Sequence, residues 1–487
     1  MLFSLHISSS PLFFCFHVAM EKTGYKAHAL ILPYPAQGHI NPMLQFAKRL
    51  VSKQIKCTLA ITVHISNSMQ SDADPNSSIA IETISDGYDD GGLKQADSDE
   101  AYIRSLNLVG SHTLEKLIRK LDDIGQPVTV LIYDGFLPWG LDVAKRFGLL
   151  GVAFFTQSCA VNNIYYHVNK GLLPVPLSNP IVSVPGLPAI KASETPTYIH
   201  DFGSDPVFYD VLVNQFSNID QADWILFNTF YFLEQKVIDY MSKTWNMGTV
   251  GPTLPSVYLD KRLEDDKDYG INLFKPKTSA CLSWLTDKPR GSVVYVSFGS
   301  MAEVTPEQMI ELAWGLRRAN YYFLWVVRES EQTKLPHKFT EEVSDKGLIV
   351  SWCPQLEVLS HESVGCFVTH CGFNSVVEAL SFGVPIVAMP QFSDQTTNAM
   401  FVEEIWGIGL RAQSDRNGTV RREMIHAFIT KVMEGDNGKE IKKNACMWKN
   451  LAKEAIDEGG SSDKNIDQFV AKLQCSAVGN SNVSLNI

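Results

Sequence analysis

The chain has few of the features that mark a nucleic-acid-binding or membrane-spanning protein. Its 487 residues include 42 Lys and Arg against 53 Asp and Glu, a formal net charge of −11, and no long basic run. An acidic chain of this kind does not favour a nucleic acid or an anionic membrane as partner. No apolar stretch reaches the roughly 20 residues of a transmembrane helix. We therefore expect a monomeric cytoplasmic protein without a transmembrane segment.

Paired metal-ligand motifs are also missing. The nine cysteines are odd in number and thinly spread. Cys366 and Cys371 are followed by no second CxxC or HxxxH pair of the kind that zinc sites use. This spacing is typical of reduced, buried thiols in a cytosolic protein, and we expect neither a metal ion nor a cofactor.

Residues 1–19 differ from the rest of the chain. They contain a short apolar core, PLFFCF, but no basic region before it and no small-residue cleavage site after it. Met20 opens a segment that runs directly into the first apolar strand. We interpret residues 1–19 as a dispensable extension, and a secretory signal is the alternative.

Short apolar strands alternate with amphipathic helices in both halves of the chain, which predicts an α/β protein with parallel sheets. We expect a helix over 41–53, with Pro42 in its first turn, and a charged pair of helices over 421–474. The string GIGLRA (407–412) fits a G-x-G-x-x-A pattern but lies in an expected strand, so we assign it no nucleotide-binding role. The expected strands are 27–35, 56–64, 128–134, 152–156, 292–300, 321–329, 347–353, 365–372 and 385–392.

The polar segment LDKRLEDDKDYG divides the two halves. We predict two Rossmann-like domains that face each other across a cleft, with ligands beyond the carboxyl ends of the strands. The predicted parts are an extension (1–19), an N-terminal Rossmann-like domain (20–258), a linker (259–280), a C-terminal Rossmann-like domain (281–460), a helix that packs back on the N-terminal domain (461–475) and a disordered tail (476–487).

The most informative segment is THCGFNSVVEAL, where a strand, a turn at Gly372 and a helix near Asn374 follow one another. Such a junction presents backbone N–H groups and the positive end of a helix dipole to an anion such as a diphosphate. The alternative is that Asn374 and Ser375 simply cap the helix. Glu378 lies one helical turn after Asn374, where a carboxylate can accept hydrogen bonds from a ribose diol.

Further polar and aromatic residues end the neighbouring strands. Trp352 can stack on a flat base, and Asp394 and Gln395 can bind sugar hydroxyls. Together, the 44 residues from Trp352 to Gln395 resemble the signature segment of the plant UDP-glycosyltransferases, which belong to glycosyltransferase family 1 and have the GT-B fold. The resemblance extends over residues 20–475, and it implies that the N-terminal domain (20–258) binds the acceptor and the C-terminal domain (281–460) binds the UDP-sugar.

The resemblance implies a role for each matched residue. It implies that Trp352 stacks on uracil, that Cys353 and Gln355 contact the uridine, and that Glu378 holds the ribose. It implies further that the diphosphate is held by His370, Asn374 and Ser375 with Ser300, and the sugar by Asp394, Gln395 and Thr156. A glutamine at the last position favours UDP-glucose in this family.

Two positions depart from the family pattern. Phe373 and Phe392 stand where the family usually has tryptophan. Phenylalanine keeps an apolar face but lacks the indole N–H, which is worth on the order of 0.5–1.5 kcal/mol if it bonds to a sugar hydroxyl. The departure concerns the choice of sugar and leaves recognition of UDP unaffected.

A transfer to a hydroxyl also needs a base, and histidine titrates in the right range. His39 follows the first strand in PYPAQGHINP, although a surface loop histidine is the alternative. Asp134 ends the strand VTVLIYD, where it either fixes the imidazole tautomer or caps the next helix. The resemblance implies that His39 is the base and Asp134 its partner.

The predicted function is an inverting, metal-independent transfer of glucose from UDP-glucose to a hydroxyl or carboxyl of a small lipophilic plant metabolite, giving a β-glucoside. One alternative is a non-catalytic UDP-sugar-binding regulatory homologue. A nucleotide-dependent oxidoreductase would need a Gly-rich turn after the first strand, and PAQGHINP lacks it. The sequence does not identify the acceptor.

Overall fold

The computed structural model describes residues 25–69, 78–269 and 271–482, with side chains up to residue 474. The predicted extension 1–19 lies outside these residues. By its internal contacts the chain divides into two compact units: 1–154 with 218–225 and 464–487, and 155–217 with 226–463. No helix in the described part of the chain is long and apolar enough to cross a membrane.

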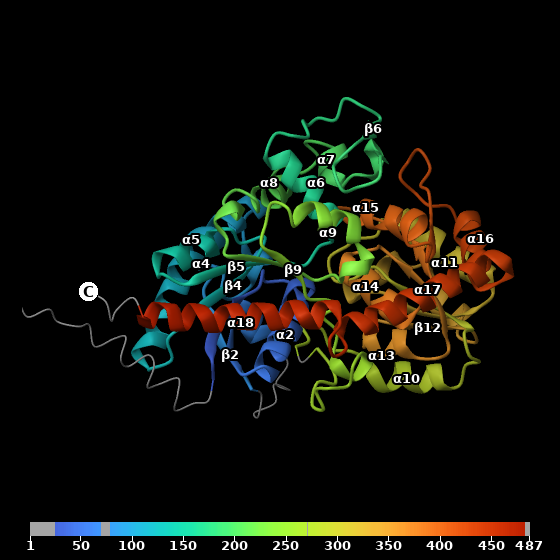
Figure 1. Ribbon diagram of the computed structural model, residues 1–487. Helices are drawn as coiled ribbons and strands as arrows, with labels where there is room; N and C mark the ends of the chain where they lie inside the picture. The colour runs from blue at the N-terminus through green and yellow to red at the C-terminus, as the bar shows by residue number, and fades with distance from the viewer. Residues whose placement is uncertain (1–24, 70–77, 270, 483–487) are drawn as a thin grey trace, which may run out of the picture. The chain divides into compact units, whose positions relative to one another are not determined.

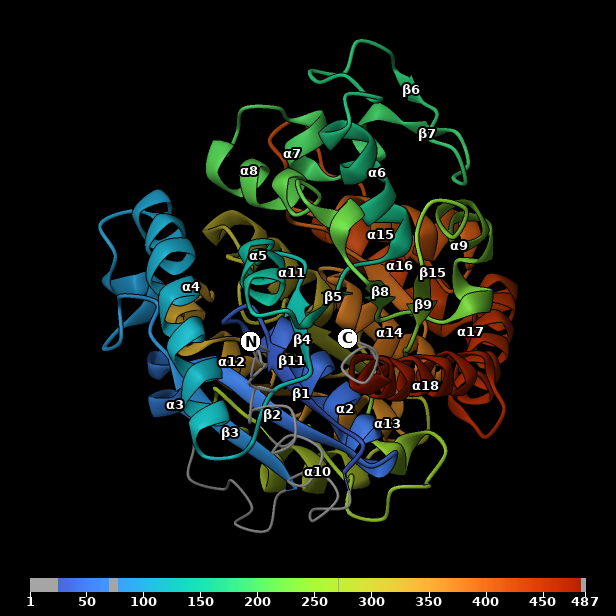
Figure 2. The ribbon, with the colours of Figure 1, turned by 60° about the vertical axis from the view of Figure 1, so that its left-hand side comes forward.

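The first sheet has seven strands in the order β3-β2-β1-β4-β5-β8-β9. Its paired strands β1 to β5 are parallel, and Figures 1 and 2 show helix α2 beside β1 and β2. The strands are β1 (Ala27–Leu32), β2 (Ile55–Thr62), β3 (Ile79–Ile84), β4 (Val130–Asp134), β5 (Leu150–Phe155), β8 (Trp224–Phe227) and β9 (Met247–Thr249).

The second sheet has six strands in the order β12-β11-β10-β13-β14-β15, all paired in parallel. Counted along the chain this is the order 3-2-1-4-5-6 of a Rossmann sheet. The expected strand at 407–412 is confirmed as β15. The strands are β10 (Val293–Ser297), β11 (Tyr322–Val326), β12 (Gly347–Val350), β13 (Val364–Thr369), β14 (Ile386–Ala388) and β15 (Gly409–Arg411).

Helices connect the strands, and the charged C-terminal part is helical as predicted. In the second unit α14 and α17 pack together (Figure 1). The helices are α2 (Gln37–Ser52), α3 (Val63–Ser68), α4 (Asp99–Asp123), α5 (Trp139–Arg146), α6 (Cys159–Asn169), α7 (Thr197–His200), α8 (Pro206–Asn214), α9 (Gln235–Met241), α10 (Thr278–Thr286), α11 (Pro306–Ala319), α12 (Phe339–Glu342), α13 (Gln355–Ser360), α14 (Phe373–Phe382), α15 (Gln395–Met400), α16 (Arg422–Met433), α17 (Gly435–Ile456) and α18 (Ser461–Asn482).

The structure corrects three local predictions. The helix expected over 41–53 begins at Gln37, so Pro42 lies inside it rather than in its first turn. Most predicted strands are shorter at their carboxyl ends, where the chain leaves the sheet for a loop; 385–392, for example, is strand only over Ile386–Ala388. Helix α18 runs past 475 to Asn482, since an established helix propagates cheaply into adjacent residues.

Helix α18 is anchored within the first unit. The ring of Phe469 lies 6.1 Å from that of Phe46 on α2 and 6.0 Å from that of Trp224 on β8. The Lys53 ammonium pairs with Asp467 at 2.5 Å. The placement of the predicted domain boundaries themselves stays a prediction.

Candidate active site

Four of the predicted site residues lie at the point where the strand order reverses in their own sheet, which is where open α/β sheets bind ligands. In the first sheet this point lies between β1 and β4; His39 follows β1, and Asp134 ends β4. In the second sheet it lies between β10 and β13, which Ser300 and His370 follow.

His39 and Asp134 form a hydrogen-bonded pair, in which Asp134 is buried and His39 half-buried. The Nδ1 atom of His39 lies 2.7 Å from Oδ2 of Asp134, and their side chains are 15% and 1% exposed. The other carboxylate oxygen accepts the backbone N–H of Phe136 at 3.0 Å. Asp134 therefore orients the imidazole and also holds the following turn, but it does not cap α5, whose N-cap is Pro138.

Aromatic rings flank the imidazole. The rings of Tyr34 and Phe136 lie 5.3 and 4.7 Å from that of His39. With Nδ1 engaged by a carboxylate, Nε2 is the nitrogen that can accept a proton from a substrate. His39 lies in the first turn of α2 and is not a loop histidine.

In the second unit, the loop after β10 and the turn after β13 pack on the two sides of one imidazole. A Cβ atom on Gly299 or Gly372 would come within 2.8 or 2.7 Å of the His370 ring. Only glycine allows this approach, and Gly299 also has a positive φ of 73°. The loop that carries Ser300 is thus brought to the start of α14.

The first turn of α14 has no side-chain cap. Ser375 instead accepts a hydrogen bond from Gln355 at 3.2 Å, and Asn374 accepts one from Asn228 at 3.3 Å. The N-cap position of α14 is Gly372, so neither Asn374 nor Ser375 is its N-cap residue. The amino end of a helix carries the positive end of its dipole, which attracts an anion.

Arg328 stabilises the loop that carries Ser300. Its guanidinium donates to the carbonyl oxygens of Ser300 and Ala302 and so fixes the loop after β10. Burial, with a smaller contribution from the positive charge of Arg328, lowers the pKa of His370 to about 4, although a hydrogen bond from the imidazole to the Ser297 backbone opposes the shift. His370 is neutral at pH 7, while Arg328 supplies the charge.

Residues predicted to bind uridine are joined by hydrogen bonds. Gln355 accepts from the Tyr295 hydroxyl at 2.8 Å and donates to Glu378 at 2.6 Å. The Tyr295 hydroxyl also lies 3.2 Å from Sγ of Cys353. The half-buried Trp352 has its ring 4.4 Å from that of Phe274.

Glu378 is 6% exposed, and both of its oxygens are engaged. Oε1 accepts from the Tyr269 hydroxyl at 2.6 Å and Oε2 from Gln355 at 2.6 Å. Burial raises the pKa of Glu378 to about 7, and the two hydrogen bonds oppose the rise. This carboxylate therefore changes charge near neutral pH.

The predicted sugar-binding residues meet at the start of α15. The Nδ2 atom of Asn398 donates to Oδ2 of Asp394 at 2.7 Å and to the carbonyl of Cys371 at 3.0 Å. Its Oδ1 accepts from Ser158 at 3.3 Å, two residues after the buried Thr156. Asn398 thus connects the strand end near Thr156, the turn before α14 and Asp394.

The amide oxygen of Gln395 bonds to the backbone of the preceding loop. Its Oε1 accepts the backbone N–H groups of Gln391 and Phe392 at 2.9 and 3.1 Å, which directs the Nε2 group elsewhere. Of the two phenylalanines that replace tryptophan, Phe373 is 3% exposed and Phe392 is half-buried against the core of the second unit.

Three residues of this site were missed from the sequence. Arg328 had a signal, since it lies at the carboxyl end of the expected strand 321–329. Asn398 lies on a helix among other polar residues, and Tyr269 lies in a charged segment without periodicity, so neither had one. Only the three-dimensional structure identifies their partners.

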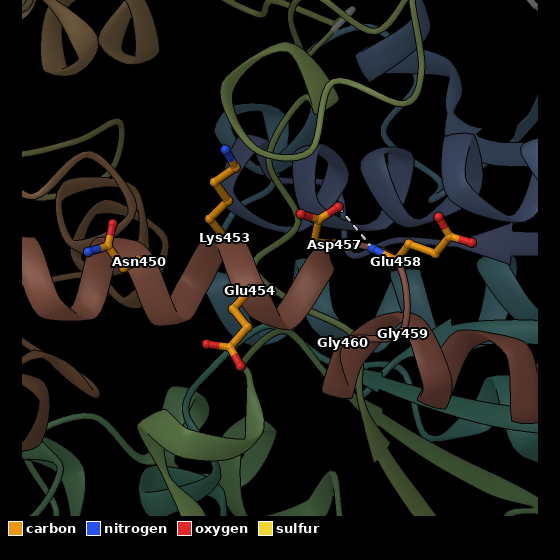
Figure 3. Close-up of a pocket in the computed structure, with 7 residues that line it drawn as sticks. All are labelled: Asn450, Lys453, Glu454, Asp457, Glu458, Gly459 and Gly460. Carbon is orange, nitrogen blue, oxygen red and sulfur yellow. Dashed lines mark hydrogen bonds between the residues drawn. The ribbon is translucent and has the colours of Figure 1, made fainter.

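A hollow of about 400 Å³ lies elsewhere, at the end of α17. Figure 3 shows the side chains of Lys453 and Glu454 pointing to opposite sides of the helix. The Asp457 carboxylate accepts the backbone N–H of Glu458 at 3.0 Å. These groups do not converge on a ligand. Among the described residues, no three His, Cys, Asp or Glu side chains are grouped to hold a metal ion.

The fold and site define a nucleotide-sugar transferase of the GT-B class, with two Rossmann-type parallel sheets. A family model described as "UDP-glucoronosyl and UDP-glucosyl transferase" matches residues 241–452. A mogroside I-E synthase of Siraitia grosvenorii is 48% identical over 92% of this chain and 98% of its own length. The chain belongs to this UDP-glycosyltransferase family, as the resemblance predicted.

Other plant proteins agree. A flavonol 7-O-beta-glucosyltransferase of Arabidopsis thaliana is 45% identical over 93% of this chain and all of its own length. The crystal structure of Os79 from O. sativa in complex with UDP is 39% identical, covers 91% of this chain and 100% of that one, and has a TM-score of 0.87. The GT-B fold class is thereby confirmed.

Proposed function

We propose that the protein transfers glucose from UDP-glucose to a hydroxyl or carboxyl of a small lipophilic plant metabolite, with inversion, to give a β-glucoside. The observation that carries the proposal is the hydrogen-bonded His39–Asp134 pair at one switch point and a helix start with Gly372 at its N-cap beside His370 at another. The named relatives, glucosyltransferases and a mogroside synthase among them, support the same reaction class.

The chemistry requires that the acceptor oxygen reach both Nε2 of His39 and the anomeric carbon of the bound sugar. Nε2 takes the acceptor proton as the oxygen forms a bond to that carbon. The bond from the anomeric carbon to the β-phosphate oxygen breaks, and its electron pair leaves with UDP. Asp134 stabilises the imidazolium that results.

The donor is held by the second unit. In this proposal Trp352, Cys353 and Gln355 bind the uridine and Glu378 the ribose. The sugar contacts come from Asp394, Gln395 and Thr156. The diphosphate lies at Gly372, Asn374 and Ser375, with His370 and Ser300 beside it, where N–H groups and the helix dipole stabilise the charge that develops on UDP.

We also propose that no divalent cation is needed, because α14 and Arg328 supply positive potential at the diphosphate. Turnover should be unchanged by EDTA and by added Mg²⁺. A loss of activity in EDTA that Mg²⁺ restores would contradict this part. Monomeric state and a cytoplasmic location stay predictions.

The test is turnover of UDP-glucose against an acceptor panel, read by mass spectrometry. The panel should contain flavonols, triterpenoids, salicylate-like phenolics and auxins. A hexose adduct with β configuration on any acceptor supports the proposal. Binding of UDP by calorimetry with no turnover on the whole panel would favour the regulatory homologue instead.

A further inference from the structure

Tyr269 makes a contact that the residues assigned above do not explain. It lies in the charged segment that the sequence suggests as a linker, yet its hydroxyl donates to Oε1 of Glu378 at 2.6 Å. Gln355 donates to Oε2 at the same distance. The buried carboxylate of Glu378 is therefore held at both oxygens by neutral groups from two different segments.

This arrangement leaves capacity for a ligand. A carboxylate oxygen has two lone pairs, and each oxygen of Glu378 is engaged here by one protein donor. The second lone pair on each oxygen can accept one hydroxyl of a vicinal diol. Fixing the first donor on each side fixes the direction in which the remaining lone pairs point.

A second contact comes from the same stretch of chain. The ring of Phe274 lies 4.4 Å from that of Trp352, tilted by 32°, and the backbone N–H of Lys277 donates to the Trp352 carbonyl at 3.0 Å. Residues before α10 thus contact both the carboxylate assigned to the ribose and the indole assigned to the base.

We propose that Tyr269 is a positioning residue of the nucleotide site, whose hydroxyl orients the Glu378 carboxylate toward the ribose hydroxyls of the donor. The inference rests on the proposed function, since it takes the ribose as the ligand of Glu378. Tyr269 does not touch the reacting atoms. It acts through Glu378 on the affinity for uridine nucleotides.

The electrostatics give this role a pH signature. The Tyr269 hydrogen bond lowers the pKa of Glu378, which burial has raised to about 7. The other titratable groups that face Glu378 are Tyr295 and Cys353, and burial raises the pKa of both. Without the Tyr269 hydroxyl, Glu378 should stay protonated to higher pH and accept ribose hydroxyls less well at pH 7.

The experiment measures the Kd of UDP and of 2′,3′-dideoxy-UDP by calorimetry from pH 6 to 8.5. The variant is Tyr269→Phe, which removes one hydroxyl. The matched control is Tyr258→Phe, a change just before the same segment at a ring that packs on Phe382 at 5.2 Å. Full-length protein is used throughout.

We expect Tyr269→Phe to weaken UDP roughly fivefold at pH 7, to recover toward pH 8.5, and to leave the Kd of the dideoxy analogue unchanged. Tyr258→Phe should match the wild type. A wild-type UDP profile in Tyr269→Phe, or an equal loss for both nucleotides at every pH, would overturn the inference. If the wild type itself fails to prefer UDP over the analogue, the ribose assignment of Glu378 is wrong, and the inference fails with it.

Discussion

The Nδ1 atom of His39 and Oδ2 of Asp134 lie 2.7 Å apart at the carboxyl ends of two adjacent strands, β1 and β4. Because β1 and β4 pair in register from Ala29 and Val130 to Leu32 and Tyr133, backbone hydrogen bonds position the histidine and the carboxylate together. Asp134 is the last residue of β4, and His39 lies in the first turn of the helix that follows β1.

Removing either member should therefore abolish transfer without loss of donor binding. His39→Ala should lower kcat by a factor of roughly 100 to 10,000, and Asp134→Asn should do so by favouring the wrong tautomer. The Kd of UDP should stay within twofold. Steady-state kinetics and calorimetry give both values.

His112→Ala is the matched control, since His112 is an exposed residue on α4. It should leave kcat unchanged. Normal turnover in His39→Ala would remove His39 from its role as base.

Arg328 should matter for the diphosphate and not for the nucleoside. Arg328→Met removes two charge-assisted hydrogen bonds to the loop that carries Ser300, each worth about 1.5–3 kcal/mol. We expect the Kd of UDP to rise roughly 10- to 100-fold, with little change for uridine. Arg317→Met, a change at an exposed arginine of α11, is the control, and equal losses for UDP and uridine would contradict the prediction.

Glu378 should make UDP binding depend on pH. Its pKa of about 7 means that the ionised form, which accepts two ribose hydroxyls, grows from pH 6 to pH 8. The affinity for UDP should rise over this range and then level off. Glu378→Gln should weaken UDP and lose the Glu378 part of the pH dependence, measured as the Kd ratio of the variant to the wild type at each pH. A constant ratio would contradict the assignment.

The titration of Glu378 affects stability in the opposite direction: rising pH increases the affinity for UDP but lowers the free energy of unfolding. The folded protein binds a proton at Glu378 that the unfolded chain, with an ordinary pKa of 4.5, releases earlier. Between pH 4.5 and 7 the contribution of Glu378 to the free energy of unfolding therefore falls as the pH rises. Ligand-free Glu378→Gln should lack this component and gain relative stability from pH 5 to pH 8.

Most of the framework was predictable because its signals are local. The apolar strands of the second half and the Gly372 turn are short-range patterns. The resemblance of residues 352–395 to the signature segment of the family indicated the fold class. Three strands of the first sheet, β3, β8 and β9, were not recognised. They are six, four and three residues long, which gives little periodicity to read, and β3 lies at the sheet edge with exposed positions.

The parts of the site that could not be predicted depend on contacts between residues far apart in sequence. Tyr269 meets Glu378 across 109 positions, and Ser158 meets Asn398 across 240. The predicted start of this helix was wrong because the missing N–H of Pro42 suits a first turn, whereas Pro42 lies inside α2. Sequence patterns report which residue types are present, but not which of them share a hydrogen bond.

Asn398 should control recognition of the sugar but not of UDP. Its amide donates to Asp394 and to the Cys371 carbonyl, so Asn398→Asp places a second carboxylate 2.7 Å from Oδ2 of Asp394. Two carboxylates this close raise each other's pKa and share a proton. We expect the Kd of UDP-glucose to rise roughly tenfold at pH 8.5 and to recover toward pH 5.5, while the Kd of UDP follows the wild type at each pH.

The ratio of the two Kd values cancels the titration of Glu378, which both ligands share. Asn444→Asp, at an amide that bonds the Gly407 carbonyl, is the control and should leave this ratio unchanged at every pH. Equal losses for UDP and UDP-glucose in Asn398→Asp would mean that Asn398 only supports the fold near α15.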